Sequence, residues 1–523
     1  MYQKQLMENC KIYVNSDASF LLAKVQQILA REGTRSYLVG GFVRDMLLGR
    51  DSGDIDIAVA SSALETAAKV AAALNGKYIP LDKVNEIGRV VLFGSGKEGT
   101  WELDFSTLKD SIENDLAQRD FTIDAMAVEL EEITLEFLTA KPISDTGTII
   151  LDVPGLIDPF NGHDDLRQGT IRAVSEPAFP ADPARLLRAV RLAAELGFNI
   201  DGETEALIRK YAHLITTVAG ERIRDELLPV FNLPGTAALL NCLDRLGLLT
   251  ELIPELSPAR GVDQPLIHYW DVFNHSIQTV AAVDFLLEHE EWPHIETDLL
   301  AAVPWSEELS QHFNQEISHG STRKALLKLA ALLHDIAKPA TKTVDEDGRA
   351  RFLGHGREGS AITTAILQRL RFSTRETRMV EIMVREHLRP TQMSNHDVPS
   401  RHAIYRYFRD TDDTGIEILF LSMADHLATR GPTLNLTEWQ AHARMVEYVL
   451  TKRLEEEQVT KPPKLIDGHD LINIFGLEPG PAVGELLEAV REAQAAGEIA
   501  VREQALDYVK LLITNDRHII PDK

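Results

Sequence analysis

Two aspartates at alternate positions of an apolar stretch are the first residues in this chain whose spacing suggests chemistry. Asp54 and Asp56 lie in the stretch GDIDI. Because side chains two positions apart on a β-strand point to the same face, the two carboxylates are expected side by side. Neighbouring carboxylates repel each other unless a cation lies between them, and Mg²⁺ prefers oxygen ligands. Asp104, in the strand-like stretch WELDFS, could complete a two-metal site for in-line phosphoryl transfer.

A pair of glycines precedes these carboxylates. Gly40 and Gly41 separate a strand-like segment from a helical one. Glycine allows a backbone to approach a phosphate closely, and a following helix N-terminus adds favourable amide dipoles. A plain strand-to-helix turn would explain the glycines alone. The carboxylate pair downstream makes a phosphate site the better interpretation.

A second polar pair stands at the start of an expected helix. Asp182 and Arg185 are three residues apart, so they share a face of that helix. A carboxylate acceptor beside a fork-shaped donor can recognise the polar edge of cytosine or adenine without a nucleic-acid template. An ordinary surface salt bridge is the structural alternative.

Histidines and aspartates in the second half of the chain form a third set. His275 is followed by the doublet His334-Asp335 in ALLHDIAKP and by Asp425 in MADH. Nitrogen and oxygen ligands converging from separate helices are typical of a hydrolytic metal centre with open positions for water and phosphate. A single buried histidine is usually a core residue, but this combination predicts a metal site.

The expected elements divide the chain into an α/β part and a helical part. Strand-like and helical stretches alternate up to about residue 160, and helix follows helix from residue 182 onward. We expect domains at 1–160, 161–255, 256–450 and 451–523, the last after the linker VTKPPK. This pattern predicts a multi-domain α+β protein.

Composition limits the function classes. The net charge of −26 opposes a generic nucleic-acid binder, although a cleft can be locally positive on an acidic body. The chain has no apolar run of the roughly 18–20 residues that span a membrane, and its first residues lack the layout of a secretory signal. Cys10 and Cys242 are the only cysteines, which excludes a disulfide framework and favours a cytoplasmic location.

The first motifs resemble those of class II tRNA nucleotidyltransferases and bacterial poly(A) polymerases, in the DNA polymerase beta-like superfamily. The stretch GGFVRD, followed by the aspartate pair, is similar to the family's first motif, and QRDFTIDA resembles the second. The resemblance implies that Mg²⁺ is bound by Asp54 and Asp56, and that the nucleotide is contacted by Gly40, Gly41, Arg44, Arg119 and Asp120.

The stretch DPARLLR resembles the amino-acid template of that family. There an aspartate and an arginine hydrogen-bond the incoming base, which implies that role for Asp182 and Arg185, with Arg188 also at the nucleotide. The resemblance further implies a nucleotidyltransferase head at 1–160, an all-α neck with an RNA-binding region at 161–255, and a tRNA-binding tail at 451–523.

The chain departs from the family pattern at several positions. Gln118, Asp124 and Ala181 replace an arginine, an asparagine and a glutamate respectively. Only STLKDSIENDLA separates Phe105 from Gln118, where enzymes that add the terminal A usually have a longer flexible segment. The short segment resembles the CC-adding subgroup, but full CCA addition stays open.

The histidine and aspartate set resembles the HD phosphohydrolase superfamily. This implies a divalent metal such as Mn²⁺, Ni²⁺ or Mg²⁺ at 256–450, bound by His275, His334, Asp335 and Asp425. His355 and His387 resemble ligands of a second metal, with a structural role as the alternative, and Lys338 could contact a substrate phosphate. In tRNA nucleotidyltransferases, such a domain resembles phosphodiesterases acting on 2′,3′-cyclic and 2′-phosphate ends.

Together these features predict an enzyme that adds C, with or without A, to the 3′ end of tRNA from CTP and ATP. Two alternatives stay open. One is a poly(A) polymerase, and the other is an HD-type nucleotide or cyclic-phosphate hydrolase with an N-terminal binding module. The sequence does not indicate the oligomeric state, and the acidic span 288–318 matches nothing in the family.

Overall fold

The computed structural model divides the chain into two compact units. The first comprises residues 1–218 with 246–248, and the second comprises 219–245 with 249–523. The boundary at 218 lies inside the expected neck, and the finer boundaries at 160, 255 and 450 stay predictions. The structure describes residues 10–93, 100–133, 148–153, 155–265, 267–289, 299–318, 320–393, 398–455 and 464–515.

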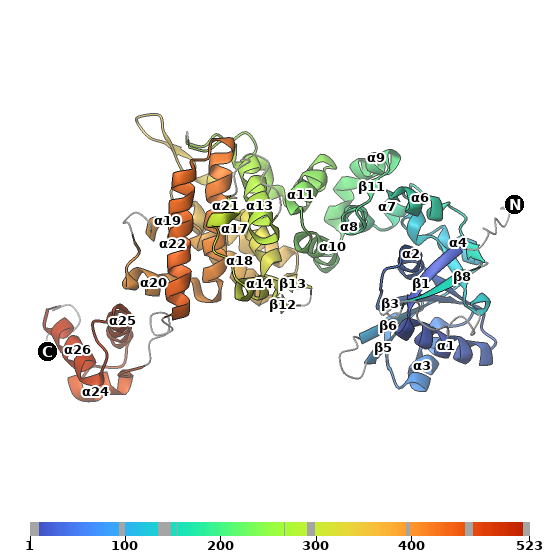
Figure 1. Ribbon diagram of the computed structural model, residues 1–523, viewed down its shortest axis with the longest axis horizontal. Helices are drawn as coiled ribbons and strands as arrows, with labels where there is room; N and C mark the ends of the chain where they lie inside the picture. The colour runs from blue at the N-terminus through green and yellow to red at the C-terminus, as the bar shows by residue number, and fades with distance from the viewer. Residues whose placement is uncertain are drawn as a thin grey trace. The chain divides into compact units, whose positions relative to one another are not determined.

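A seven-stranded sheet forms the centre of the first unit (Figure 1). Only β3 and β6 run parallel among the paired strands of this sheet that the structure describes, and the other pairs are antiparallel. The strand order is β4 (Lys77–Asp82), β5 (Ile87–Phe93), β6 (Thr100–Thr107), β3 (Asp54–Val59), β2 (Ser36–Val39), β7 (Ala127–Glu129) and β9 (Leu156–Ile157).

Alternation along β3 and β6 separates a buried face from an open one. Ile55 and Ile57 are fully buried, as are Leu103 and Phe105 on the neighbouring strand. Helix α3 (Ala63–Leu74) packs against β4, β5 and β6. The buried apolar side chains therefore fix the register, and the polar residues between them must lie on the opposite face.

Helices continue the first unit beyond the sheet. They are α1 (Ser16–Arg31), α2 (Gly41–Leu48), α4 (Ile112–Leu116), α6 (Gly162–Gln168), α7 (Ala178–Ala181), α8 (Arg185–Leu196) and α9 (Gly202–Tyr211). A further strand pair joins β1 (Cys10–Asn15) to β8 (Thr148–Val153). The predicted mixture of an α/β head followed by helices is thus confirmed.

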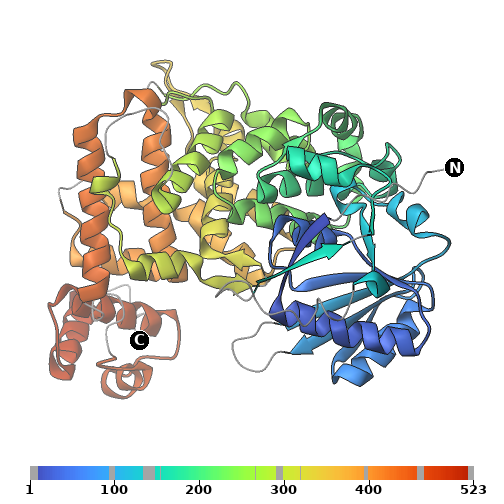
Figure 2. The same ribbon diagram turned by 45° about the vertical axis from the view of Figure 1, so that its right-hand side comes forward.

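Helices dominate the second unit (Figure 2). Its centre is built from α13 (Val272–Glu288), α15 (Arg323–Leu333), α17 (His355–Arg369), α18 (Thr374–Glu386) and α21 (Gly415–Arg430). Around these lie α10 (Gly220–Asn232), α11 (Thr236–Arg245), α14 (Glu307–Asn314), α16 (Lys338–Thr341), α20 (Arg401–Thr411) and α22 (Leu436–Glu455).

The C-terminal helices have a hydrophobic core of their own. Helices α24 (Gly468–Phe475), α25 (Pro481–Ala496) and α26 (Arg502–Asn515) pack around Leu471 and Val509. Ion pairs attach this tail to α20, since Arg409 contacts Glu488 at 2.8 Å and Glu492 at 2.9 Å. The contact between the tail and α20 is therefore polar.

Part of the acidic span that the sequence left unexplained is folded into the second unit. Phe313 on α14 is buried, and the His312 Nε2 lies 2.9 Å from the Glu417 Oε1 on α21. The buried Glu417 carboxylate also accepts a hydrogen bond from Arg323 at 2.7 Å. These contacts anchor α14 against the core helices, so this part of the span has a structural role.

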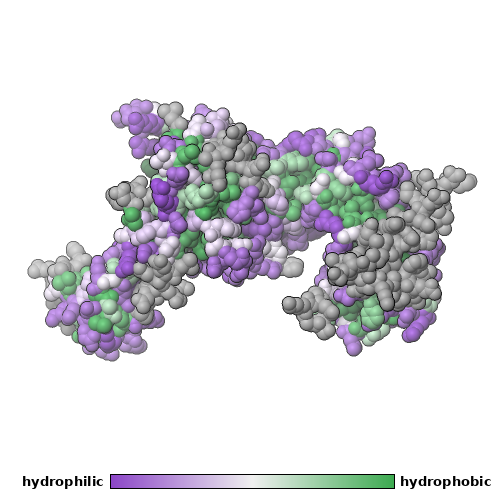
Figure 3. All heavy atoms as spheres, in the orientation of Figure 1, coloured by the Kyte–Doolittle hydropathy of each residue, from purple (hydrophilic) through white to green (hydrophobic). Residues whose placement is uncertain are grey.

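Among the described residues, no helix is both long and apolar enough to cross a bilayer. Figure 3 shows hydrophilic side chains spread over the visible face, with smaller apolar patches between them.

Candidate active sites

The parallel pairing of β3 and β6 places four carboxylates on the open face of the sheet. Asp56 lies opposite Asp104, and Asp54 lies opposite Glu102. The shared face predicted for the aspartate pair follows from the alternation, because Ile55 between them is buried on the other face. The register also brings Asp104 beside the pair, as the sequence suggested.

Arg89 on β5 is a partner of these carboxylates that the sequence analysis missed. Its Nε and Nη2 lie 2.7 Å and 2.8 Å from the two oxygens of Asp104, and its Nη1 contacts Glu102. Such a two-pronged contact fixes Asp104 geometrically. By contrast, neither Asp54 nor Asp56 forms an ion pair with any residue that the structure describes.

Burial and neighbouring charge make the Asp54–Asp56 pair costly to ionise without a cation. Burial raises the pKa of Asp56 to about 6, and Asp104 adds to the effect while Arg119 opposes it. Burial and Glu102 also raise the pKa of Asp54. A group whose ionised form is destabilised in this way is suited to bind a divalent cation.

This pKa shift predicts a pH dependence of metal binding. Below about pH 6, a proton occupies Asp56 and competes with the metal, so the dissociation constant for Mn²⁺ should rise by up to about tenfold per pH unit. Electron paramagnetic resonance titrations of Mn²⁺ between about pH 5 and about pH 8 would measure this in an Asp335→Asn background, which removes the contribution of the HD centre. Asp56→Asn is the matching control: its asparagine does not titrate, so the affinity of the transferase site for Mn²⁺ should stay constant over the same pH range.

A glycine with an unusual backbone conformation brings Arg119 next to Asp56. Gly40 has a φ of 74°, and a Cβ atom there would lie 2.5 Å from Arg119 Nη1 and 2.9 Å from Asp56 Oδ2. No other residue type fits this position without displacing those groups. The following residue, Gly41, starts α2. The guanidinium, the carboxylate and the glycine turn therefore form one cluster.

Two arginines of the predicted nucleotide site, the buried Arg44 and the partly exposed Arg188, form ion pairs with nearby aspartates. The Arg44 Nη1 lies 2.7 Å from the Asp124 Oδ1, and its Nε lies 2.9 Å from Asp45. The Arg188 Nε on α8 lies 3.1 Å from the Asp120 Oδ2. Asp124, one of the departures from the family pattern, thus supplies the negative charge that Arg44 pairs with.

The predicted base-reading residues Asp182 and Arg185 also lie close to each other. The Arg185 Nε lies 3.9 Å from the Asp182 Oδ2, and α8 begins at Arg185. Asp182 accepts a hydrogen bond from the backbone of Ala184 at 3.3 Å. Both side chains stay partly exposed, at 28% for Asp182 and 22% for Arg185, and Arg185 Nη1 also donates to the Ala178 carbonyl at 3.3 Å.

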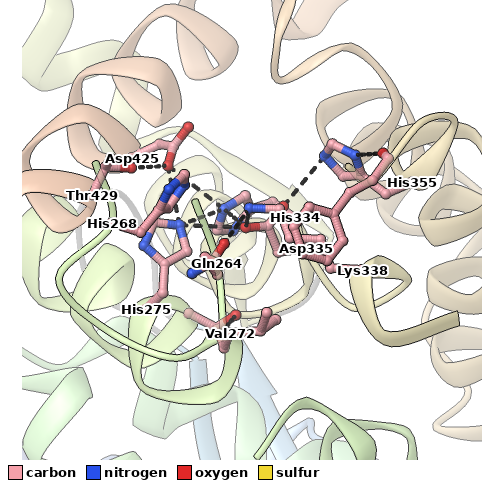
Figure 4. Close-up of polar contacts among 12 residues, drawn as sticks. Gln264, His268, Val272, His275, His334, Asp335, Lys338, His355, Asp425 and Thr429 are labelled. Atoms are coloured by element: carbon pink, nitrogen blue, oxygen red, sulfur yellow. Dashed lines mark hydrogen bonds and ion pairs between the residues drawn. The ribbon is translucent and has the colours of Figure 1, made fainter. Parts of the chain in front are cut away.

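The histidines and aspartates of the second unit converge from separate helices (Figure 4). The Nε2 of His275 on α13 lies 3.2 Å from the Nε2 of His334, which follows α15. It also lies 3.4 Å from Asp335 and 3.1 Å from Asp425 on α21. All four predicted residues of the HD set are therefore brought to one point.

Two further histidines gather on the other side of Asp335. The Nε2 atoms of His355 and His387 are 3.2 Å apart, and they lie 3.3 Å and 3.8 Å from Asp335 Oδ1. The other oxygen of Asp335 faces His275 and His334. Asp335 is thus placed as a bridging carboxylate between two ligand groups of three residues each.

The hydrogen bonds behind the ligands orient them. The Nδ1 atoms of His334, His355 and His387 lie 2.8 Å, 2.7 Å and 2.7 Å from the carbonyl oxygens of Ala331, Phe352 and Val384. Because a carbonyl only accepts, each Nδ1 carries the hydrogen and each Nε2 is free to bind a metal. Two metal–nitrogen bonds of about 2.1 Å at a tetrahedral angle separate their nitrogens by about 3.4 Å, close to the observed spacing.

Charge and burial suit this cluster to a metal. Burial lowers the pKa of His387 to about 3, with a further contribution from His334, so its imidazole is neutral as a ligand must be. Although burial acts in the opposite direction, His275 holds the pKa of Asp425 below its ordinary value. Asp335 is buried, with Oδ1 facing the second histidine group and Oδ2 facing both the first group and Lys338.

Lys338 lies directly beside the bridging carboxylate. Its Nζ is 2.5 Å from Asp335 Oδ2 and 2.6 Å from Gln264 Oε1, and the residue is buried. The sequence suggested Lys338 as a phosphate contact but gave no signal for Gln264 or for His268, whose ring lies 5.6 Å from that of His275.

Comparisons with known proteins match most of this chain. The family model of the poly A polymerase head domain matches residues 36–172, the HD domain matches 272–430, and the tRNA nucleotidyltransferase domain 2 matches 363–509. The A-adding tRNA nucleotidyltransferase of Deinococcus radiodurans is 32% identical over 90% of this chain and 94% of its own length. The CC-adding tRNA nucleotidyltransferase of Geobacter sulfurreducens is 32% identical over 94% and 96%.

Solved structures share the fold. The Thermotoga maritima CCA-adding enzyme, solved in complex with tRNA, has a TM-score of 0.56 and 22% identity over 96% of this chain and 99% of that one. A CCA-adding enzyme solved with CTP has a TM-score of 0.59 and 20% identity over 96% and 99%.

Proposed function

Since this chain belongs to the tRNA nucleotidyltransferase family, we propose that it adds C, with or without a final A, to the 3′ end of tRNA. CTP and ATP are the nucleotide donors, and pyrophosphate is released. The observation that carries this proposal is the Asp54–Asp56 pair, which has no ion-pair partner among the described residues and lies beside Gly40 and Arg119. This arrangement suits a metal next to a triphosphate.

Each residue of the cluster has a proposed part in the reaction. Asp54 and Asp56 bind Mg²⁺, which when bound lowers the pKa of the RNA 3′-hydroxyl and neutralises charge on the α-phosphate. Arg119 donates charge-assisted hydrogen bonds to the triphosphate, and Gly40 lets the backbone approach it. Asp104, held by Arg89, assists by adding negative charge beside Asp56, which strengthens the attraction for a cation.

The network around α8 positions the remaining groups. Arg188 pairs with Asp120 and links α8 to the second motif, so the base-reading residues are held relative to the triphosphate site. Asp120 contacts the ribose of the incoming nucleotide. Gly41 and Arg44 support the turn below the phosphates, where the Arg44–Asp124 pair fixes the start of α2.

Base selection by Asp182 and Arg185 gives a testable consequence. Arg185→Ala removes the donor of the pair, so the preference for CTP over ATP at the first addition step should fall by about 10- to 100-fold. Single-turnover extension of truncated tRNA with each nucleotide measures this ratio. Arg191→Ala is the matched control, because Arg191 lies on the same helix but pairs with Glu195 at 2.7 Å.

The named relatives and the fold of the segment before Gln118 bear on two open questions, which are tRNA specificity and the number of nucleotides added. The relatives that match nearly the whole chain are tRNA-specific enzymes by name, so the poly(A) polymerase alternative is not favoured. The relatives include both A-adding and CC-adding enzymes at equal identity. The segment before Gln118 folds into the short helix α4 with Ile112 and Leu116 buried, which supports CC addition over full CCA addition.

The product length tests this proposal. Purified protein is incubated with tRNA that lacks its 3′ end, together with CTP, with ATP, or with both. We expect growth by two nucleotides with CTP alone. A third nucleotide with both donors would identify full CCA addition, whereas runs of A from ATP alone would identify a poly(A) polymerase.

We also propose that the second unit hydrolyses phosphate esters at RNA ends, such as 2′,3′-cyclic and 2′-phosphate groups. Nucleotidyltransferase and HD domains depend on divalent metals. The mixed imidazole and carboxylate set favours Mn²⁺ or Ni²⁺, with Mg²⁺ as the other candidate. When bound, such a metal supplies an activated water, while Lys338 binds the phosphate. The unpaired carboxylates at 54 and 56 argue against hydrolysis as the only activity.

A further inference from the structure

A short non-helical segment lies against the HD centre. Residues 260–265 and 267–271, called the strap from here on, lie between the 3₁₀-helix Pro254–Ala259 and α13. The strap is fixed at its ends, since the Gly261 backbone donates to Asp271 at 2.7 Å and the Tyr269 backbone donates to the Thr429 carbonyl at 2.9 Å. It is therefore attached to α21, the helix that carries Asp425.

The strap is also attached to the residues that follow the HD doublet. Lys338 donates to Gln264 at 2.6 Å, and Lys342 donates to the Asp263 carbonyl at 3.1 Å. Among its described residues, the strap thus has contacts on both sides of the centre. A segment held in this way can present a side chain in a defined position without the rigidity of a helix.

His268 is the side chain that the strap places at the centre. Its ring meets that of His275 edge-on, with centroids 5.6 Å apart and planes at 74°, and Figure 4 shows it beside Asp425 and His275. It is only partly buried, whereas the ligand His275 is completely buried. His268 belongs to neither ligand group. Because it is partly exposed and contacts His275, it can reach a molecule bound at the centre.

The hydrogen bonds of His268 define what it can bind. Its backbone N–H and its Nδ1 lie 2.9 Å and 3.3 Å from the Pro265 carbonyl, so Nδ1 carries the hydrogen. With Nδ1 as the donor, Nε2, on the edge away from Pro265, is left as a hydrogen-bond acceptor.

We infer that, when the HD centre hydrolyses a 2′-phosphate, His268 Nε2 accepts a hydrogen bond from the neighbouring 3′-hydroxyl of the ribose. Lys338 is a donor only and suits a phosphate oxygen, whereas His268 is an acceptor and suits a hydroxyl. Together they distinguish a ribose phosphate with a neighbouring hydroxyl from a phosphate ester without one. This inference rests on the proposed hydrolase function and assigns the substrate selectivity of that same site.

The test compares two nucleotides that differ in one hydroxyl. Adenosine 2′-phosphate carries the neighbouring 3′-hydroxyl, and 3′-deoxyadenosine 2′-phosphate lacks it. Manganese-loaded wild-type protein should prefer the first by about 10- to 100-fold in kcat/KM. In His268→Ala the preference should fall to within about twofold, while hydrolysis of p-nitrophenyl phosphate and the bound manganese content stay unchanged.

A control variant and a binding measurement keep the outcomes distinct. Ile267→Ala changes a neighbouring strap residue that is 52% exposed and should keep the wild-type preference. Calorimetric binding of both nucleotides tests the same ratio if turnover is absent. Absence of hydrolysis of all three compounds would overturn the hydrolase function alone. An equal preference in wild type and His268→Ala, by turnover or by binding, would overturn the role of His268.

Discussion

Asp54→Ala should reduce nucleotide addition to truncated tRNA by about 10³-fold or more, because it removes one of two carboxylates that hold the catalytic cation. The neighbouring Asp56 already has a raised pKa of about 6, so a single remaining carboxylate is a poor ligand. Radiolabelled CTP incorporation measures transfer. Hydrolysis of adenosine 2′-phosphate by the same preparation should be unaffected, because the HD centre uses other residues.

The matched control for this variant is Asp110→Ala. Asp110 is an exposed carboxylate that follows β6, and its removal should leave both activities within about twofold of wild type. Equal loss of transfer and hydrolysis in Asp54→Ala would contradict two independent sites.

Asp335→Asn should have an effect of similar size on hydrolysis, again about 10³-fold. Asp335 is the only described residue whose two oxygens face both ligand groups, so both metal positions depend on it. The asparagine keeps the size of the side chain but offers one neutral oxygen in place of two charged ones. Manganese bound per chain, measured by plasma mass spectrometry, should fall together with hydrolysis.

Nucleotide addition to tRNA should persist in Asp335→Asn, because the residues of the transferase site lie in the first unit. Asp347→Asn, at an exposed position of the hairpin between Thr343 and Arg351, is the control for a neutralised aspartate nearby. Full manganese content in Asp335→Asn would be incompatible with a bridging role.

Local patterns predicted the parts of the transferase site that depend on one element. Alternation along β3 is enough to place Asp54 and Asp56 on one face. Asp182 and Arg185 lie close, but Asp182 has an extended backbone before α8, so a turn and not a shared helical face brings them together. Arg89 was not foreseen because its contact with Asp104 requires the pairing of β5 with β6. Strand register between separate segments is set by packing across the sheet, which one strand's sequence does not contain.

The same distinction explains the HD centre and the ion pairs around α8. Residue types predicted the ligands, but the bridging position of Asp335 depends on how α17 and α18 pack together. The strap offered no periodic signal, and His268 was therefore missed. Asp124 was only a departure from the family pattern in the sequence, whereas the structure shows that it forms an ion pair with the buried Arg44.

The central claim is that Asp54 and Asp56 jointly bind magnesium beside a nucleoside triphosphate. A crystal structure of the protein with Mg²⁺ and a non-hydrolysable CTP analogue tests it directly. We predict one Mg²⁺ bonded at about 2.1 Å to an oxygen of each aspartate and to the triphosphate. Carboxylates that point apart, or a metal bound to Asp104 without either of them, would contradict the claim.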